Sequence, residues 1–304
     1  MTRVPAPAVW VTVYDDLAGA KALALLDRLA RAAAPGDLGV VIHDPPGDDE
    51  RRLADAVRAR GLRLAYAWGV DPDVRRPLRD AAALTRRRAR LAAERGAEFV
   101  ELNGEAAWKH TGPIEGHPLA PLARALLDAC REGAPDACLS WTTYDHVQWH
   151  RLPYAVILGD GGVDRFAPQL YGDDPTTPGP DGHKGVLARM ARAGAQLADL
   201  VRRKVARAEL GPGGSGWTPY GQVHGLTPAG AAVVLDAAST VRAWALPTRH
   251  DDAGLEALEG VLVARRAHGA EGGALRRFQA AHGLALDGIL GPATLAALRA
   301  RLAP

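Results

Sequence analysis

The chain of 304 residues is poor in cysteine, in net charge and in long apolar runs. Its two cysteines, Cys130 and Cys138, are too few for a disulfide scaffold and lack the spacing with histidines of a metal site. A formal net charge of +2 creates no global field that favours nucleic acid. No window reaches the roughly 18 uncharged apolar residues that a membrane span requires. These shortages argue against disulfide-rich, nucleic-acid-binding and membrane-spanning proteins.

Three catalytic chemistries also lack their motifs. His146 and His150 are four residues apart, but no His-Glu-x-x-His pattern accompanies them, so we expect no metal and no cofactor. Cys130 falls late in a helical pattern and Cys138 at the start of a strand pattern, far from where a cysteine nucleophile is needed. The glycine-rich stretch "GPGGSG" lacks the Lys and Ser/Thr of a phosphate-binding loop.

What the chain does have is a regular alternation of strand and helix patterns. Each apolar strand-like run is followed by a helical or irregular connection, and no glycine-rich phosphate turn follows the first run, as an open nucleotide-binding sheet would have. Eight such units over about 265 residues favour an α/β fold of the (β/α)8 TIM-barrel type. The predicted strands are residues 9–15, 38–44, 62–70, 97–105, 137–145, 163–171, 216–222 and 241–247.

The densest basic run falls on an Ala-rich helical pattern after the third strand. A solvated helix face is the interpretation we favour, with an anion-binding patch as the alternative. Nucleic-acid binding would also require interleaved aromatic residues, and the run has none. It comprises Arg75, Arg76, Arg79, Arg86, Arg87, Arg88, Arg90 and Arg95.

Polar residues recur at every second position of the fourth strand, "FVELNGEAAWKH". Successive strand side chains point to opposite faces, so Glu101, Asn103 and Glu105 share one face while Val100 and Leu102 share the other. An unpaired buried carboxylate costs several kcal/mol or takes up a proton, so these residues need a structural or a chemical reason. At the carboxyl end of a barrel strand they would face the substrate.

The last 30 residues carry a recognisable pattern, "LRRFQAAHGLALDGILGPATLAAL". It resembles the peptidoglycan-binding module of cell-wall hydrolases, although the additional helix ahead of this part and the second Asp-Gly loop of such modules are shortened or missing. Gly288 and Gly291 allow tight turns and Phe278 belongs to a small apolar core. From the resemblance we expect an all-α module at residues 269–304, with Phe278, Asp287, Gly288, Gly291 and Thr294 in its binding pattern, behind a barrel at residues 1–268. The module nominates peptidoglycan glycan strands as partner.

The spacing of Glu101, Asn103 and Glu105 in turn resembles the acidic end of strand four in chitinase-like glycoside hydrolases of family 18. The resemblance implies that Glu105 protonates the leaving oxygen and that Asn103 orients the 2-acetamido group of the substrate, with Glu101 as an inner partner. Glu101 and Asn103 stand where Asp is usual in that family. Tyr171 would be the tyrosine of strand six, with Gly172 in place of the following Asp, and Trp244 the tryptophan under the sugar.

A route with two carboxylates stays open as well. Glu105 would then act with Asp15, Asp71 or Asp145 at the barrel mouth, about 5 Å apart for retention or about 6.5–9.5 Å for inversion. Aromatic rings near strand ends offer apolar faces for pyranose rings. The candidate sugar-binding residues are therefore Asp15, Trp68, Trp108, Trp141, Asp145, Tyr171, Trp217 and Trp244.

We therefore predict a peptidoglycan glycoside hydrolase of lysin type that cleaves between N-acetylated amino sugars. A catalytically inactive protein that binds the cell wall is the alternative. The start "MTRVPAPAVW" lacks a secretory signal, so we expect synthesis in the cytoplasm and action at the wall after release or delivery, for example as a phage lysin or a component of an injection device. The sequence does not fix the oligomeric state or which glycosidic bond is cut.

Overall fold

The structure is a computed structural model that describes residues 8–13, 20–44, 47–70, 72, 77–109, 117–144, 152–171, 216–217, 220–222, 241–246, 252–269, 273–288 and 290–302. These residues form two units. The first unit holds residues 65–169 with 216–217. The second holds residues 8–64 with 170–171 and 220–302. Each strand is described below with the unit that contains most of it.

The first unit is a parallel sheet with its connecting helices. Its strands, in the order in which they pair, are β3 (Arg63–Gly69), β4 (Phe99–Asn103), β5 (Cys138–Tyr144), β6 (Arg165–Tyr171) and the short β7 (Gly216–Trp217). The connections contain α3 (Leu78–Glu94), the 3-10 turn η2 (Ala106–Trp108), α4 (Ala120–Gly133) and α6 (Tyr154–Ile157). All five residues of β4 are buried, as expected for a parallel strand that is covered on both faces.

The second unit is also built on parallel strands. Strand β1 (Val9–Val13) pairs with β2 (Leu38–His43) on one side and with β9 (Val241–Leu246) on the other, and β9 pairs with β8 (Tyr220–Gln222). Every residue of β1 and β2 is buried. The helices of this unit are α1 (Ala20–Ala32), α2 (Gly47–Ala59), α9 (Asp252–His268), α10 (Ala274–Ala281) and α11 (Pro292–Leu302).

The alternation read from the sequence is reproduced closely. The first six predicted strands correspond to β1 to β6, the seventh appears as the short strands β7 and β8, and the eighth is β9. All the pairings described above are parallel, as the α/β prediction requires. Closure of these strands into one eight-stranded barrel stays a prediction.

The Arg-rich helix α3 shows how its composition sets its packing. Its alanines at 89 and 92 are buried, and α4 packs beside it with Ala123, Leu126 and Leu127 turned inward. The small alanine side chains let the two helices approach, while Arg79, Arg87 and Arg90 are exposed. These arginines therefore form a solvated face.

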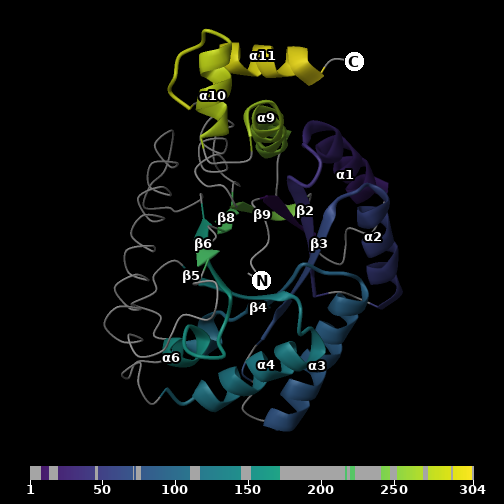
Figure 1. The fold of residues 1–304 in the computed structure, drawn as a ribbon, viewed down its shortest axis with the longest axis vertical. Coiled ribbons are helices and arrows are strands. Elements are labelled where there is room, and N and C mark those ends of the chain that lie inside the picture. Colours follow the sequence, from purple (N-terminus) through teal and green to yellow (C-terminus); the bar gives the residue numbers. More distant parts are fainter. Residues whose placement is uncertain are drawn as a thin grey trace. The chain divides into compact units, whose positions relative to one another are not determined.

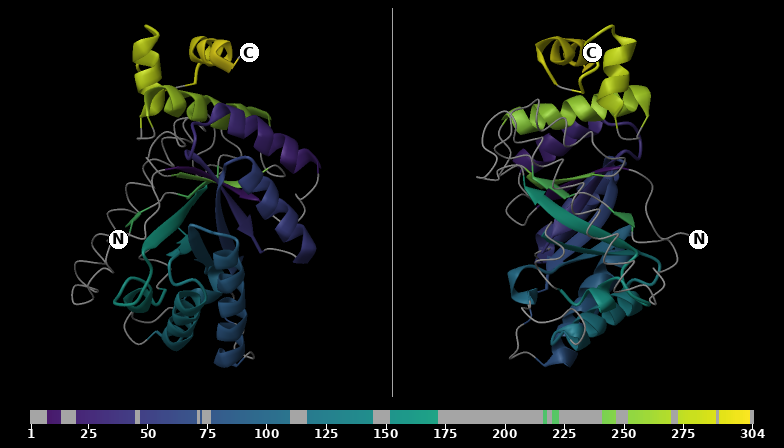
Figure 2. Two further views of the ribbon diagram at one scale, coloured as in Figure 1. Left: turned by 45° about the vertical axis from the view of Figure 1, so that its right-hand side comes forward. Right: turned by 90° about the vertical axis from the view of Figure 1, so that its left-hand side faces the viewer.

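Among the three C-terminal helices, α9 contacts both of the others. Helix α9 lies alongside α1, and α10 and α11 contact α9 (Figures 1 and 2). Gly260 of α9 makes this contact close, because a Cβ atom there would lie 3.2 Å from methyl carbons of Leu290 and Leu298. A free-standing core of this size would be marginal, so the module borrows apolar surface from α9.

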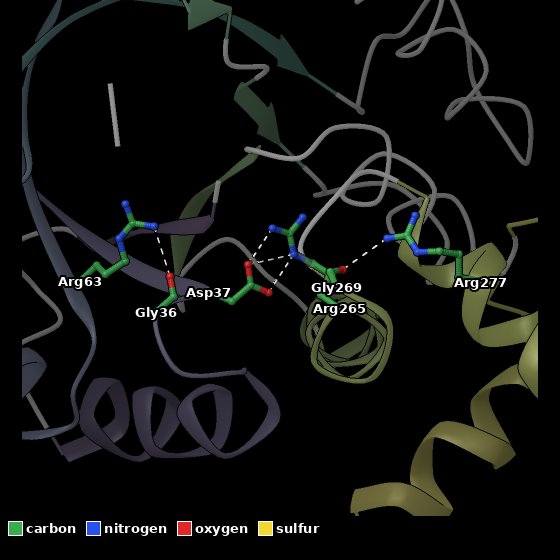
Figure 3. Close-up of polar contacts among 6 residues, drawn as sticks. All are labelled: Gly36, Asp37, Arg63, Arg265, Gly269 and Arg277. Carbon is green, nitrogen blue, oxygen red and sulfur yellow. Dashed lines mark hydrogen bonds and ion pairs between the residues drawn. The ribbon is translucent and has the colours of Figure 1, made fainter. Parts of the chain in front are cut away.

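A buried ion pair fixes α9 in place. Arg265 of α9 donates to Asp37, just before β2, at Nε–Oδ2 2.9 Å and Nη2–Oδ1 2.7 Å (Figure 3). Their exposed fractions are 1% and 4%. On either side, Arg63 donates to the Gly36 carbonyl and Arg277 of α10 donates to the Gly269 carbonyl (Figure 3).

The predicted domains, residues 1–268 and 269–304, differ from the two units in kind. The units are defined by packing, whereas a module is defined by its sequence pattern, so the predicted boundary stays a prediction. Within the described ranges, no helix combines the length and apolar composition that a bilayer span needs.

Candidate functional site

The register of β4 with its neighbours divides the sheet into two differently equipped faces. Glu101 is aligned with Ala67 of β3 and Ser140 of β5, and Asn103 with Gly69 and Thr142. Aligned residues of neighbouring strands share a face. Glu101 and Asn103 therefore lie on one polar face, where the small side chains of the neighbouring strands leave them room.

Glu101 occupies the inner part of this face and is fully buried. Its Oε2 accepts a hydrogen bond from Ser140 Oγ at 2.9 Å and lies 3.8 Å from Arg165 Nη2 on β6. Arg165 also donates to Ser140 Oγ at 3.3 Å and packs its guanidinium 3.8 Å from the centre of the Phe99 ring. Glu101 is thus the anion of a buried polar network, and sequence reasoning missed Ser140 and Arg165.

Asn103 and Glu105 form the outer part. Asn103 Nδ2 donates to Glu105 Oε1 at 3.0 Å. Asn103 is 8% exposed, whereas Glu105 is half-buried and follows the last residue of β4 by two positions. The amide therefore orients a carboxyl group that stands at the carboxyl end of a parallel strand, where active sites of such folds are found.

A buried tryptophan anchors the loop that carries Glu105. The Trp108 indole N–H donates to the Val70 carbonyl after β3, and its backbone N–H donates to the Glu105 carbonyl at 3.0 Å. Behind it, buried His117 donates from Nε2 to the Trp108 carbonyl at 3.2 Å, because its Nδ1 accepts from the Leu119 N–H. Trp108 therefore holds Glu105 through the backbone.

Three of the predicted sugar-stacking rings lie in the core instead. Trp68 and Trp141 are aligned with Leu102, on the face of the sheet opposite to Glu101 and Asn103. Trp108 packs edge-on against Trp141 with ring centres 5.0 Å apart, and Trp68, Trp108 and Trp141 have exposed fractions of 1%, 0% and 0%. Stacking on a pyranose requires an open ring face, which these indoles do not have in this structure.

The absent side chain of Gly104 explains the close packing at this point. A Cβ atom there would lie 2.6 Å from the Trp141 ring, and the Gly104 N–H donates to the Thr142 carbonyl at 3.1 Å. The glycine between Asn103 and Glu105 thus lets β4 end directly against the tryptophan.

Other predicted site residues fall outside what the structure describes. Asp15, Asp71 and Asp145 are not among the described residues, nor are His146 and His150. For three further residues the strands are described but the side chains are not: Tyr171 in β6, Trp217 in β7 and Trp244 in β9. Their roles stay predictions.

The two cysteines are buried and are not joined in a disulfide. Burial raises the pKa of the Cys130 thiol, which keeps it protonated. A protonated thiol is a poor nucleophile, so this geometry gives no support to a cysteine hydrolase.

In the C-terminal module, the motif residues meet around one glutamine. Gln279 is 1% exposed; its Nε2 donates to Asp287 Oδ1 at 2.8 Å and to Thr294 Oγ1 at 3.2 Å. Its Oε1 accepts the Gly288 N–H at 2.8 Å, and Gly288 has a φ of 70°, which favours glycine. Gln279 was quoted in the motif but not predicted as a site residue, and it organises the Asp-Gly turn.

The remaining motif residues complete the fold of the module. Phe278 is fully buried and stacks on His282 with ring centres 4.1 Å apart. Gly291 precedes α11, and its carbonyl accepts the Leu295 N–H at 2.9 Å. The signature thus encodes a turn and a core.

Comparisons with known proteins concern the C-terminal module and the fold of the chain. Residues 273–298 match the family model described as "Putative peptidoglycan binding domain". No curated protein matches the chain significantly.

Several solved structures share the fold at low sequence identity. A GH18 chitinase from Pseudoalteromonas aurantia matches with a TM-score of 0.50 and 13% identity, over 82% of this chain and 98% of its own. A GH5_18 protein from Streptomyces cattleya, solved with Manb1-4GlcNAc, matches with a TM-score of 0.50 and 16% identity over 97% of both chains. The endoglucanase Cel5A from Pseudomonas stutzeri matches with a TM-score of 0.53 and 12% identity, over 85% and 96%.

At these identities the likeness concerns the fold, since unrelated activities share such folds. The chain therefore combines a fold like that of barrel glycoside hydrolases with a C-terminal segment that matches a peptidoglycan-binding module.

Proposed function

We propose that this protein is a glycoside hydrolase of lysin type that cleaves between N-acetylated amino sugars of peptidoglycan. The observation that carries the proposal is the Asn103–Glu105 hydrogen bond at the end of β4. It holds a half-buried carboxyl group at a strand end, in a fold shared with a chitinase. The wall-binding segment supplies the substrate class.

In this mechanism Glu105 protonates the glycosidic oxygen as the bond to the anomeric carbon breaks. The hydrogen bond from Asn103 orients the carboxyl group for this transfer. An asparagine amide also has an acceptor oxygen, which suits the N–H of a 2-acetamido group. The acetamido oxygen would then attack the anomeric carbon, and water would open the resulting ring. A partner carboxylate from Asp15, Asp71 or Asp145 is the second route.

A wall-binding protein without catalysis is the alternative, and one observation favours it. Glu101 is committed to Ser140 and Arg165, which leaves Glu105 as the carboxylate of this face that is open to solvent among the described residues. Most glycosidases employ two carboxylates, so a protein that had lost its second one would keep the fold and the module.

The test is incubation of the purified full chain with insoluble peptidoglycan, followed by mass spectrometry of the soluble fragments. The proposal expects fragments with new reducing ends, and the identity of the reducing sugar names the bond that is cut. Sedimentation with the wall, without any new reducing end, would establish the binding protein and end the enzymatic proposal.

A further inference from the structure

A basic pocket lies in the second unit, away from β4. It has a volume of about 850 Å³ and is bordered by the ends of α1 and α2, by α9 and by α11. Among the described residues that line it, the charged ones are five arginines and one carboxylate: Arg28, Arg31, Arg60, Arg266, Arg301 and Glu259. The pocket therefore carries an excess of positive charge.

Two of these arginines are neutralised by carboxylates. Arg28 and Glu259 form a bidentate pair, Nε–Oε1 and Nη2–Oε2, both at 2.5 Å. Arg60 holds Asp27 in the same way, Nε–Oδ1 at 2.7 Å and Nη2–Oδ2 at 3.1 Å. Such paired forks fix the walls of the pocket but add little net charge.

The other three arginines have no carboxylate partner within the part of the chain that the structure describes. Arg266 spends one donor, Nη1, on the Arg31 carbonyl at 2.9 Å. Arg31, Arg266 and Arg301 are all exposed to the pocket solvent. The hydrogen bond from Arg60 lowers the pKa of Asp27, with smaller contributions from the charges of Arg60 and Arg31, although desolvation opposes this.

Helix ends alone do not explain this convergence. A cation near a helix C-terminus is favourable, which accounts for the positions of Arg31, Arg266 and Arg301 in the last turns of α1, α9 and α11. That effect acts within each helix, however, and needs no shared concavity. Bringing cations from α1, α9 and α11 together raises their mutual repulsion, which a bound anion relieves.

We propose that this pocket binds an oxyanion with more than one phosphate or carboxylate group, contacted by Arg31, Arg266 and Arg301. A guanidinium offers a planar fork that matches two oxygens of either group. A volume of about 850 Å³ exceeds what a single phosphate fills, so several charged groups on one ligand suit it better.

One wall of the pocket is held by a buried ion pair. The buried pair of Arg265 and Asp37 holds α9 against the segment before β2, which contains the pocket residue Gly36 (Figure 3). A site whose walls are already ordered loses less entropy on binding. The proposal does not depend on glycan cleavage at β4.

The test is isothermal titration calorimetry of the full chain at low salt, with sodium tripolyphosphate and with citrate. Saturable binding of at least one probe is expected, and the preferred probe tells phosphate from carboxylate. The double variant Arg31→Gln/Arg301→Gln should raise the dissociation constant by about tenfold or more, as expected for the loss of charge-assisted hydrogen bonds. The variant Arg31→Lys/Arg301→Lys, which keeps the charge but loses the forks, should lie between.

The matched control is Arg87→Gln/Arg90→Gln on α3, which removes two exposed arginines outside the pocket. It should change the dissociation constant by less than about twofold, because neither arginine lines the pocket. Thermal unfolding of each variant checks that it is folded. The absence of saturable binding by the unmutated chain would overturn the proposal. An equal rise of the dissociation constant in Arg31→Gln/Arg301→Gln and in the control Arg87→Gln/Arg90→Gln would also overturn it.

Discussion

The carboxylates near the two ends of β4 have different surroundings. At the inner end, Glu101 is fully buried, forms an ion pair with Arg165 and accepts a hydrogen bond from Ser140. At the outer end, Glu105 is half-buried and accepts a hydrogen bond from the neutral amide of Asn103. A carboxylate whose charge is compensated inside the protein supports the fold, whereas one held by an amide at an open strand end can exchange a proton with a substrate.

The first way to break this comparison is to remove the inner carboxylate. Glu101→Ala leaves Arg165 buried without its anion, so the free energy of unfolding should fall by about 3–5 kcal/mol. Denaturant unfolding measures it. Glu94→Ala on the exposed end of α3 is the control and should stay within about 0.5 kcal/mol. Glu101→Leu/Arg165→Met should recover most of the loss, since an apolar pair of similar volume can replace a buried ion pair. A loss below about 1 kcal/mol for Glu101→Ala would remove its structural role.

At the outer end, Asn103→Ala should separate activity from stability. We expect the rate of glycan cleavage to fall by about 10- to 100-fold, because Glu105 loses the hydrogen bond that orients it. The free energy of unfolding should fall by only about 1 kcal/mol, the contribution of one partly exposed hydrogen bond. Reducing-end assays and denaturant unfolding of one preparation supply both numbers. An unchanged rate would show that Asn103 does not orient the acid.

Trp108→Phe should lower both the stability of the protein and the rate of glycan cleavage. Phenylalanine keeps the aromatic contact with Trp141 but cannot donate to the Val70 carbonyl, which costs about 1–2 kcal/mol of unfolding free energy. The Glu105 loop should loosen, with a cleavage rate lower by about tenfold. If the stability falls while the rate is unchanged, Trp108 serves the core alone.

The smallest expected effect is on the pH dependence of stability, and it concerns His268 of α9 rather than Glu105. Burial, followed by the charges of His282, Arg277 and Arg301, lowers the pKa of His268. The unfolded chain therefore binds a proton more readily than the folded one, and stability should decline as pH falls below the ordinary histidine pKa of about 6.5. His268→Phe keeps the edge contact with Phe278 and should flatten this decline, as thermal unfolding between neutral and acidic pH would show. An unchanged slope would place the acid sensitivity elsewhere.

Much of the fold could be predicted from the sequence because parallel strands are buried on both faces and read as continuous apolar runs. Runs such as "VWVTV" and "LGVVIH" correspond directly to β1 and β2. The Asp-Gly turn of the module was equally readable, because Gly288 adopts a φ that glycine favours.

The site was less predictable because it depends on register between strands. Parity within β4 shows that Glu101, Asn103 and Glu105 share a face, but only alignment with β3 and β5 places Trp68 and Trp141 on the other. A shift of one residue would have reversed that result. The partner Arg165 is 64 positions from Glu101, and no local pattern connects the two.

The most direct measurement of the central claim is the initial rate of reducing-end release from peptidoglycan by Glu105→Gln, beside the unmutated chain and the control Glu94→Gln. Glutamine keeps the size and a hydrogen-bonding group but cannot transfer the proton, so the account predicts a rate lower by about 10²- to 10⁴-fold with an unchanged unfolding midpoint. Equal rates for Glu105→Gln and Glu94→Gln would contradict it.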